Sequence, residues 1–199
     1  MYRSVAILIL ALLQGCSEIS RYYIPDAPSE NVRLHPGGSC SAPDATYIFN
    51  VVPGIDGFIS ARVRNEGWGL YYGFSVSKGS KIRITNPVLK IRDADSGKEI
   101  DVPIQEFRLS VYGGLPGRPA GYYETYAAGT ELAYTGLNEP LNVDYLRRDS
   151  FQSGINISGQ HPSSFELTIP ALIADGISIE PVRVRFRYTE TKYVLACVQ

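Results

Sequence analysis

Residues 68–76 (WGLYYGFSV) decide the fold class, because large apolar side chains recur there at every second position. The even-numbered residues of this stretch would share one face, since successive side chains of an extended strand point to opposite faces of a sheet. The odd-numbered positions carry only glycine, tyrosine and serine. The pattern predicts a strand with one face in the core, and it places Trp68 in that core.

The same alternation recurs along the chain, in residues 47–51, 59–63, 165–169 and 182–188 among others. Glycine and proline separate these stretches at short intervals, as they do in proteins built from many short strands. We therefore expect an all-β protein, an antiparallel β-sandwich of about nine strands and immunoglobulin-like type. A partly open β-barrel is the alternative.

Three local features refine this expectation. The apolar positions change parity between residues 100–104 and 107–111, which predicts a bulge or turn near residues 105–106. Residues 189–192 are predicted to turn the chain into a C-terminal hairpin that ends at Cys197. Residues 146–149 are the one place where a helical turn is expected.

The composition is that of a single domain, and its charge balance argues against binding of nucleic acid. The chain has 14 Tyr, 19 Gly and 13 Pro among 199 residues, a strand-and-turn composition. Its 19 basic and 20 acidic side chains nearly balance, and removal of residues 1–15 would take away one Arg and leave a formal charge of −2. Such a balance gives no steering field toward nucleic acid.

The N-terminus has the layout of a secretory signal. Arg3 precedes the apolar run VAILILALL at residues 5–13, and the small residue Gly15 stands before Cys16. The sequence Leu13-Gln14-Gly15-Cys16 resembles the lipobox of bacterial lipoproteins. A transmembrane helix would need roughly 20 apolar residues, and an ordinary cleaved signal peptide is the second alternative.

This resemblance implies a processing pathway and a location. Residues 1–15 would be removed as a signal peptide, and Cys16 would be acylated and anchor the protein in a lipid bilayer. Ser17 at the next position implies the outer membrane in a Gram-negative cell. Residues 16–44, rich in Ser, Pro, Gly and charge, are expected to be a flexible tether, and residues 45–199 the β-sandwich domain.

Two cysteines remain if Cys16 carries lipid. In an oxidising periplasm the pair Cys40 and Cys197 is expected to form a disulfide that encloses nearly the whole domain. Two buried free thiols are the alternative. No C-x-x-C spacing indicates zinc or redox chemistry.

A tyrosine-rich stretch, residues 112–129 (YGGLPGRPAGYYETYAAG), is the main candidate for a binding surface. Tyrosine on a glycine-rich loop offers contact area at low entropic cost. The residues to test there are Arg118, Tyr122, Tyr123 and Tyr126. The alternative is a crossover whose tyrosines pack over the edge of a sheet.

A stripe of cations provides a second candidate. Arg183, Arg185 and Arg187 would lie on one face of a strand, about 6–7 Å apart. They could bind carboxylates, lipid headgroups or glycan phosphates. An ordinary solvated face, paired across strands with acidic residues, is the alternative.

Catalytic and metal-binding patterns are weak. His161 has Ser158, Ser163 and Ser164 nearby in the sequence, and a hydrolase site would need Asp149 or Asp175 as well. No nucleophile-elbow motif supports it. Neither His35 nor His161 has a partner at metal-ligand spacing, so we expect no metal and no cofactor.

The sequence thus predicts a non-enzymatic, membrane-anchored lipoprotein of the cell envelope. Its leading role is a protein-binding module, as in an envelope or secretion accessory subunit or an immunity lipoprotein that neutralises a toxin. A glycan- or peptidoglycan-binding lipoprotein that uses Tyr122, Tyr123 and Tyr126 is the alternative. A hydrolase is the least favoured hypothesis.

Overall fold

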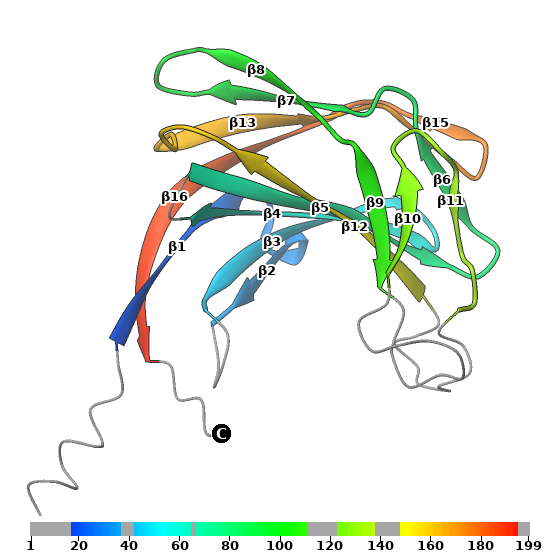
Figure 1. Ribbon diagram of the computed structural model, residues 1–199, viewed down its shortest axis with the longest axis horizontal. Coiled ribbons are helices and arrows are strands. Elements are labelled where there is room, and N and C mark those ends of the chain that lie inside the picture. The colour runs from blue at the N-terminus through cyan, green and yellow to red at the C-terminus, as the bar shows by residue number, and fades with distance from the viewer. Residues whose placement is uncertain (1–16, 37–41, 65–66, 111–122, 138–147, 195–199) are drawn as a thin grey trace, which may run out of the picture.

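The computed structural model describes residues 17–36, 42–64, 67–110, 123–137 and 148–194 (Figure 1). In these residues one short 3-10 helix, η1 (Ser29–Asn31), accompanies sixteen strands. The strands are β1 (Ser17–Asp26), β2 (Val32–His35), β3 (Asp44–Val52), β4 (Ile55–Arg64), β5 (Gly67–Ser77), β6 (Lys81–Ile84), β7 (Val88–Asp93), β8 (Glu99–Pro103), β9 (Glu106–Ser110), β10 (Tyr123–Ala127), β11 (Leu132–Ala133), β12 (Arg148–Ile157), β13 (Ser164–Ile169), β14 (Leu172–Ala174), β15 (Ile177–Ile179) and β16 (Val182–Val194).

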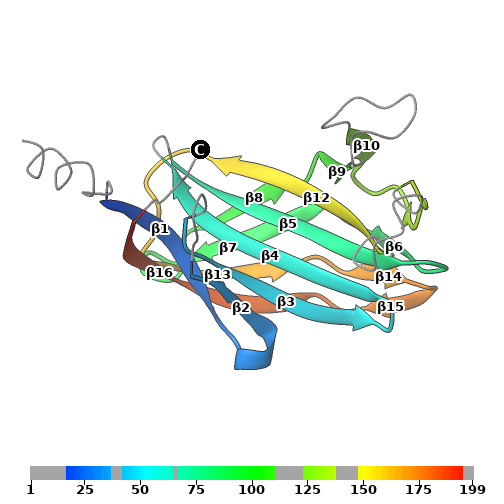
Figure 2. The same cartoon turned by 90° about the horizontal axis from the view of Figure 1, so that it is seen from below.

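Twelve strands form one antiparallel sheet with the order β10-β9-β12-β5-β4-β1-β16-β13-β7-β8, and β3 carries β2 at its side. The sheet branches at β4, because β3 pairs with most of that strand while β1 pairs with it only between Tyr22 and Arg62. It curls so strongly that its two halves lie over each other (Figure 2). We call β9, β12, β5, β4 and β3 the upper wing, and β16, β13, β7 and β8 the lower wing; these names do not refer to the view of Figure 1, in which β7, β8 and β13 lie at the top.

The core fills the space between the wings. The even-numbered residues of β5 are buried, as the sequence predicts, and Trp68 is only 4% exposed. Its indole ring packs against Phe165 of the lower wing, with ring centroids 4.9 Å apart. The fully buried large side chains include Tyr23, Tyr72, Phe74, Phe107, Phe151, Phe165 and Phe186.

A second sheet of four short strands, ordered β11-β6-β14-β15, adds to this core from one end of the molecule. Its buried side chains, Ile82, Ile84, Leu132, Leu172 and Ala174, belong to the same hydrophobic cluster as the wings. One contiguous core thus serves both sheets.

The all-β, antiparallel prediction is confirmed, and its finer form needs correction. The immunoglobulin-like sandwich of about nine strands would place two separate sheets face to face. The described residues instead form one continuous curled sheet plus a small one, because β1 connects the upper and lower wings through hydrogen-bonded pairing. This arrangement is closer to the predicted alternative, a partly open barrel.

The tether expected for residues 16–44 is also wrong over its described part. Residues 17–26 form β1, which pairs with β16 along its whole length, from Ser17 opposite Val194 to Asp26 opposite Arg185. Residues 32–35 form β2 at the side of β3. The polar composition of this segment concealed one deeply buried side chain, Tyr23. The boundary predicted at residue 45 therefore does not separate a tether from a domain.

Two local predictions fail near strand ends. β16 continues without a turn through residues 189–192 to Val194, so the predicted C-terminal hairpin does not form within the described residues. Arg148 and Asp149 begin β12 instead of ending a helical turn. By contrast, the chain does turn at residues 104–105, between β8 and β9, where the change of parity predicted it.

Candidate functional site

The candidate site is a gap in the upper wing, where β9 separates from β12. β12 pairs with β5 along all ten of its residues, but β9 pairs with it only at Phe151 and Gln152. From Ser153 to Ile157, the edge of β12 that faces away from β5 has no strand neighbour among the described residues. We call these five residues the free edge of β12.

The backbone groups of Gly154 and Asn156 point into this gap. The carbonyl oxygens of Phe151, Ile155 and Ile157 lie against β5, since each is the nearest atom that a Cβ on an opposing β5 glycine would meet. In an antiparallel strand, alternate residues direct their N–H and C=O groups to opposite edges. Within the described residues, Gly154 and Asn156 therefore present unpaired backbone donors and acceptors to the gap.

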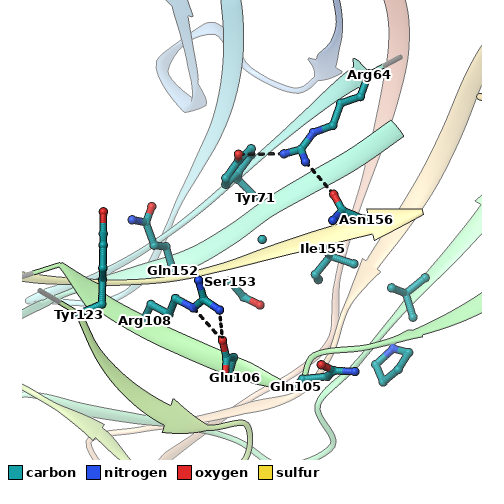
Figure 3. A pocket seen from close by; sticks show the side chains of 13 residues that line it. Arg64, Tyr71, Gln105, Glu106, Arg108, Tyr123, Gln152, Ser153, Ile155 and Asn156 are labelled. Atoms are coloured by element: carbon teal, nitrogen blue, oxygen red, sulfur yellow. Dashed lines mark hydrogen bonds and ion pairs between the residues drawn. The ribbon is translucent and has the colours of Figure 1, made fainter. Parts of the chain in front are cut away.

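A cleft of about 710 Å³ lies along this edge (Figure 3). This volume falls within the range of ligand-binding sites. Most of its walls come from the outer face of the upper wing and from the corner between β8 and β9. The lining residues are Arg64, Tyr71, Val102, Pro103, Gln105, Glu106, Arg108, Tyr123, Gln152, Ser153, Gly154, Ile155 and Asn156.

Arg64 is the principal charged group of the cleft. Its guanidinium donates to Asn156 Oδ1 at 2.7 Å and to the Tyr71 hydroxyl at 2.8 Å (Figure 3). The side chain crosses β5 above Gly69, where a Cβ would stand 3.5 Å from Arg64 Nε. Both acceptors are neutral, and no acidic side chain of the described residues forms an ion pair with Arg64.

The other arginine of the cleft is already neutralised. Arg108 Nη2 lies 2.6 Å from Glu106 Oε1, and its Nε donates to the same oxygen at 2.7 Å. Two exposed tyrosines, Tyr71 and Tyr123, stand at different sides of the cleft. Among the described residues, the cleft thus combines one cation that has no acidic partner with aromatic and amide groups.

A second recess, of about 310 Å³, continues beyond the free edge of β12. Its apolar lining comes from both wings: Trp68 and Ile157 from the upper wing, Ile91 and Ile100 from the lower. Asp93, Lys98 and polar residues of the segment after β12 complete its rim. The Asp93 carboxylate accepts from the Asp95 and Ser96 backbone N–H groups. The hydroxyl of Ser96, together with these two backbone bonds, holds the pKa of Asp93 below its usual value.

The residues of the tyrosine-rich candidate surface have different positions in the structure. Tyr123 is exposed and lines the cleft. Tyr126 is half-buried, because its ring packs edge-on against Phe151 at 5.3 Å and its hydroxyl donates to Glu124 Oε2. For Tyr126 the alternative, packing against the sheet, describes its position. Arg118 and Tyr122 lie outside the described residues.

The three arginines of β16 lie on the outer face of the lower wing, away from the cleft. Glu166 stands directly opposite Arg185 across the β13–β16 pair, and Asp26 stands opposite it on the β1 side. Arg187 lies 4.0 Å from Asp26, and Arg185 donates to Ser164 Oγ at 3.4 Å. Arg183 stands opposite Thr168. This mixture of signs is the cross-strand pairing expected of a solvated face.

The hydrolase constellation is dispersed in the structure. The His161 ring stacks on Tyr188 with centroids 4.7 Å apart, and its Nδ1 is buried without a hydrogen-bond partner among the described residues. Ser163 donates to Asp95. The two aspartates serve turns elsewhere: Asp149 accepts from the N–H and hydroxyl of Thr135, and Asp175 accepts from the N–H of Lys81.

Several predicted features fall outside the described residues. They include the lipidation site Cys16 and the expected disulfide partners Cys40 and Cys197. Across residues 17–36, 42–64, 67–110, 123–137 and 148–194, no cluster of three potential metal-ligating side chains occurs. No helix in those same ranges is long and apolar enough to cross a membrane.

Sequence reasoning missed Arg64, Tyr71, Gly154 and Asn156. Arg64 and Tyr71 stand on the polar face of good strands, where such residues are ordinary. β12 itself has no clear strand pattern, because its inward positions include Asp149 and Ser153, which weaken the apolar alternation. The signal that could have found the site is the change of parity near residue 105, since it marks the corner between β8 and β9 that borders the cleft.

Comparison with protein-family models, with curated proteins and with solved structures finds no match.

Proposed function

We propose that this protein is a protein-binding module of the cell envelope that takes up an extended segment of its partner along the free edge of β12. The observation that carries the proposal is the unpaired backbone of Gly154 and Asn156, among the described residues, within a cleft. An exposed strand edge is a template for another strand, and main-chain hydrogen bonds supply affinity in such strand addition.

The cleft suits a strand better than a compact ligand. Residues 152–156, five successive positions of β12, line it, and a separate apolar recess lies at the next residue, Ile157. A segment laid along β12 would recover the hydrogen bonds that β9 supplies only at Phe151 and Gln152. The corner at Pro103 and Gln105 would form the opposite wall.

The test combines photo-crosslinking with an edge variant. A photoreactive amino acid replaces Gln105 at the rim, and a second variant carries it at Lys90 on the lower wing as control. Irradiated cell envelopes should give a covalent adduct with one protein from position 105 only. Mass spectrometry should map that adduct to a short segment of the partner.

A proline at position 154 tests whether the backbone of β12 binds the partner segment. Gly154→Pro removes the N–H that faces the gap and keeps the pairing with β5, as proline does at strand edges. It should abolish the adduct, whereas Gly154→Ala, which keeps that N–H, should reduce it far less. A Cβ at this position meets only Tyr71 Cε1, at 3.7 Å. An adduct that persists in Gly154→Pro, at unchanged folded content by circular dichroism, would refute strand addition.

A glycan ligand is the second candidate, and the exposed rings of Tyr71 and Tyr123 favour it. They are 37% and 49% exposed in a cleft that also holds the amides of Gln152 and Asn156. Aromatic faces and amides suit sugar rings. Co-sedimentation with purified peptidoglycan, lost in the Tyr71→Ala variant, would support this candidate, and absence of the protein from the pellet would eliminate it.

The envelope location rests on the lipobox-like sequence before Cys16. Because β1 begins at Ser17, an acyl anchor on Cys16 would be joined to the sheet directly, with about 3.8 Å between the two Cα atoms. The domain would then sit on the bilayer surface without a spacer. Intact mass of the membrane-extracted protein should show the acyl chains, and Cys16→Ser should remove them together with membrane fractionation.

A further inference from the structure

The chemistry of the two sides of the β12 edge differs, and it specifies what kind of segment fits. On β12, Gln152, Gly154 and Asn156 belong to the outer face, while Ser153, Ile155 and Ile157 face the core. A strand added to this edge must alternate in the same way, because side chains in a sheet have a period of two. Its successive residues therefore meet two different environments.

The outer environment is cationic. The cross-strand register places Asn156 opposite Gly69 and Gly69 opposite Arg62, so Arg64, two residues further along β4, shares their face. The guanidinium is held in place by Tyr71 and Asn156, two neutral acceptors, and no acidic side chain in the described part of the chain compensates its charge. Arginine held in this way is suited to a carboxylate, whose charge strengthens the hydrogen bonds it accepts.

The inner environment is apolar. Ile157 pairs with Trp68 across the β5–β12 ladder, and both line the recess of about 310 Å³. Ile100 of β8 closes it from the lower wing and remains only half-buried. An inward-pointing apolar side chain of an added strand would reach this recess and cover surface that β12 alone leaves open to water.

We propose that the segment bound along β12 carries an acidic residue that pairs with Arg64 and, one or three residues away, an apolar residue that fills the recess beside Trp68, Ile100 and Ile157. This inference rests on the strand addition proposed above. It adds the chemical class of the ligand, an acidic–apolar peptide, and states that an odd number of positions separates the acidic residue from the apolar residue, which we call its two anchors. The odd spacing follows because the two anchors enter opposite faces of the sheet.

The test uses fluorescein-labelled peptides of nine residues with one Asp and one Leu in a Ser/Thr background. Two peptides separate Asp and Leu by one or three positions, and two peptides of identical composition separate them by two or four. Binding to the full chain in detergent is followed by fluorescence anisotropy. The odd-spaced peptides should bind about tenfold more tightly, roughly the value of one charge-assisted contact.

Variants of the protein at Arg64 and of the peptide at its Asp test whether these two groups contact each other. Arg64→Gln should lower the affinity for an odd-spaced peptide about tenfold, and replacement of its Asp by Asn should do the same. Combining both changes should give no further loss, as expected for two groups that act on each other. Arg92→Gln, an exposed position on the outer face of the lower wing, is the matched control and should leave the affinity unchanged.

The outcomes separate this inference from the function on which it rests. Equal affinity for odd and even spacing, or an Arg64→Gln variant that binds normally, overturns the acidic–apolar pattern. If binding in that case is still lost in Gly154→Pro, strand addition stands. If no peptide binds and the crosslink at position 105 also persists in Gly154→Pro, both proposals fail.

Discussion

Trp68 on β5 and Phe165 on β13 lie with their ring centroids 4.9 Å apart, although their strands are not neighbours in the sheet. Tyr23 of β1 contacts both rings, at 5.8 Å from Trp68 and 5.0 Å from Phe165. The three aromatic side chains thus join the upper wing, the lower wing and the strand that connects them. This cluster is part of the core that holds the two wings against each other.

Phe165→Ala should therefore destabilise the whole fold. Phe165 is fully buried, and its loss removes apolar contacts from both wings and leaves a cavity, at a cost of about 3–5 kcal/mol in the free energy of unfolding. Urea denaturation followed by the fluorescence of Trp68, the single tryptophan, measures it directly. Tyr123→Ala, at an exposed position, is the control and should change stability by less than about 0.5 kcal/mol. A similar small loss in Phe165→Ala would contradict the packing.

Tyr23→Ala distinguishes the strand β1 from the tether that composition suggests. A tether residue could be truncated without effect on the domain. In the structure Tyr23 is fully buried, and its hydroxyl donates to the Pro162 carbonyl at 2.9 Å. The substitution should cost about 3–5 kcal/mol. Tyr22→Ala, at a neighbouring position on the opposite face of β1, is not a clean control because Tyr22 is also buried. Ile19→Ala, 46% exposed, should be nearly neutral in the same urea titration.

These positions show how far the sequence predicts the fold. The strands with strict apolar alternation, such as β5 and the first half of β16, follow directly from burial of one face. β1 could not be predicted in this way, because Arg21, Pro25 and Asp26, which lie close to Tyr23 in the sequence, give the segment a polar composition that does not indicate a buried side chain. The pairing of β1 with both wings is a long-range property that no local pattern records.

The candidate site could not be predicted from the sequence for a related reason. The cleft exists because β9 pairs with β12 at only two residues, and pairing is not visible in either strand alone. The sequence does indicate Tyr123 as a candidate, and the structure places it at the cleft. Arg64 gains its significance only from Gly69, Tyr71 and Asn156, which come from two other strands.

Gly73→Ala should be far more costly than Gly154→Ala, although both glycines lie on the outer face of adjacent strands. A Cβ on Gly73 would collide with the Phe151 carbonyl oxygen and stand 2.5 Å from Phe58 Cζ. The backbone of β12 cannot move away without breaking its ladder with β5, so we expect a loss of about 1–3 kcal/mol.

Gly154 has space, since its nearest neighbour would be Tyr71 Cε1 at 3.7 Å. Its replacement by alanine should leave thermal stability within about 0.5 kcal/mol of the parent, helped by the lower entropy of the unfolded chain. Equal melting temperatures for Gly73→Ala and the parent would show that β5 and β12 are not packed as described.

Tyr72 supplies a pH-dependent prediction. It is fully buried between Phe74 and Phe107, and its hydroxyl has no hydrogen-bond partner within the part of the chain that the structure describes. Burial raises the pKa of Tyr72 well above its usual value, because the phenolate cannot be solvated in the core. The folded state thus holds this proton at pH values where the unfolded chain, with a tyrosine pKa of about 10, releases it.

The sign of the linkage follows from that difference. Below about pH 10 both states carry the proton, and stability does not depend on it. Above about pH 10 the unfolded state binds fewer protons than the folded state, so stability falls, by up to about 1.4 kcal/mol per pH unit for each such group. Tyr23, whose pKa burial also raises, adds to the same alkaline loss.

Tyr72→Phe removes one of these groups and the unpaired hydroxyl with it. At pH 7 the variant should match the parent or exceed it by up to about 1 kcal/mol, because no hydrogen bond between described residues is lost. Between pH 10 and pH 11 its stability should fall less steeply than that of the parent. Urea titrations at both pH values measure the two effects. A variant less stable than the parent at pH 7 by more than about 1 kcal/mol would mean that the Tyr72 hydroxyl has a partner after all.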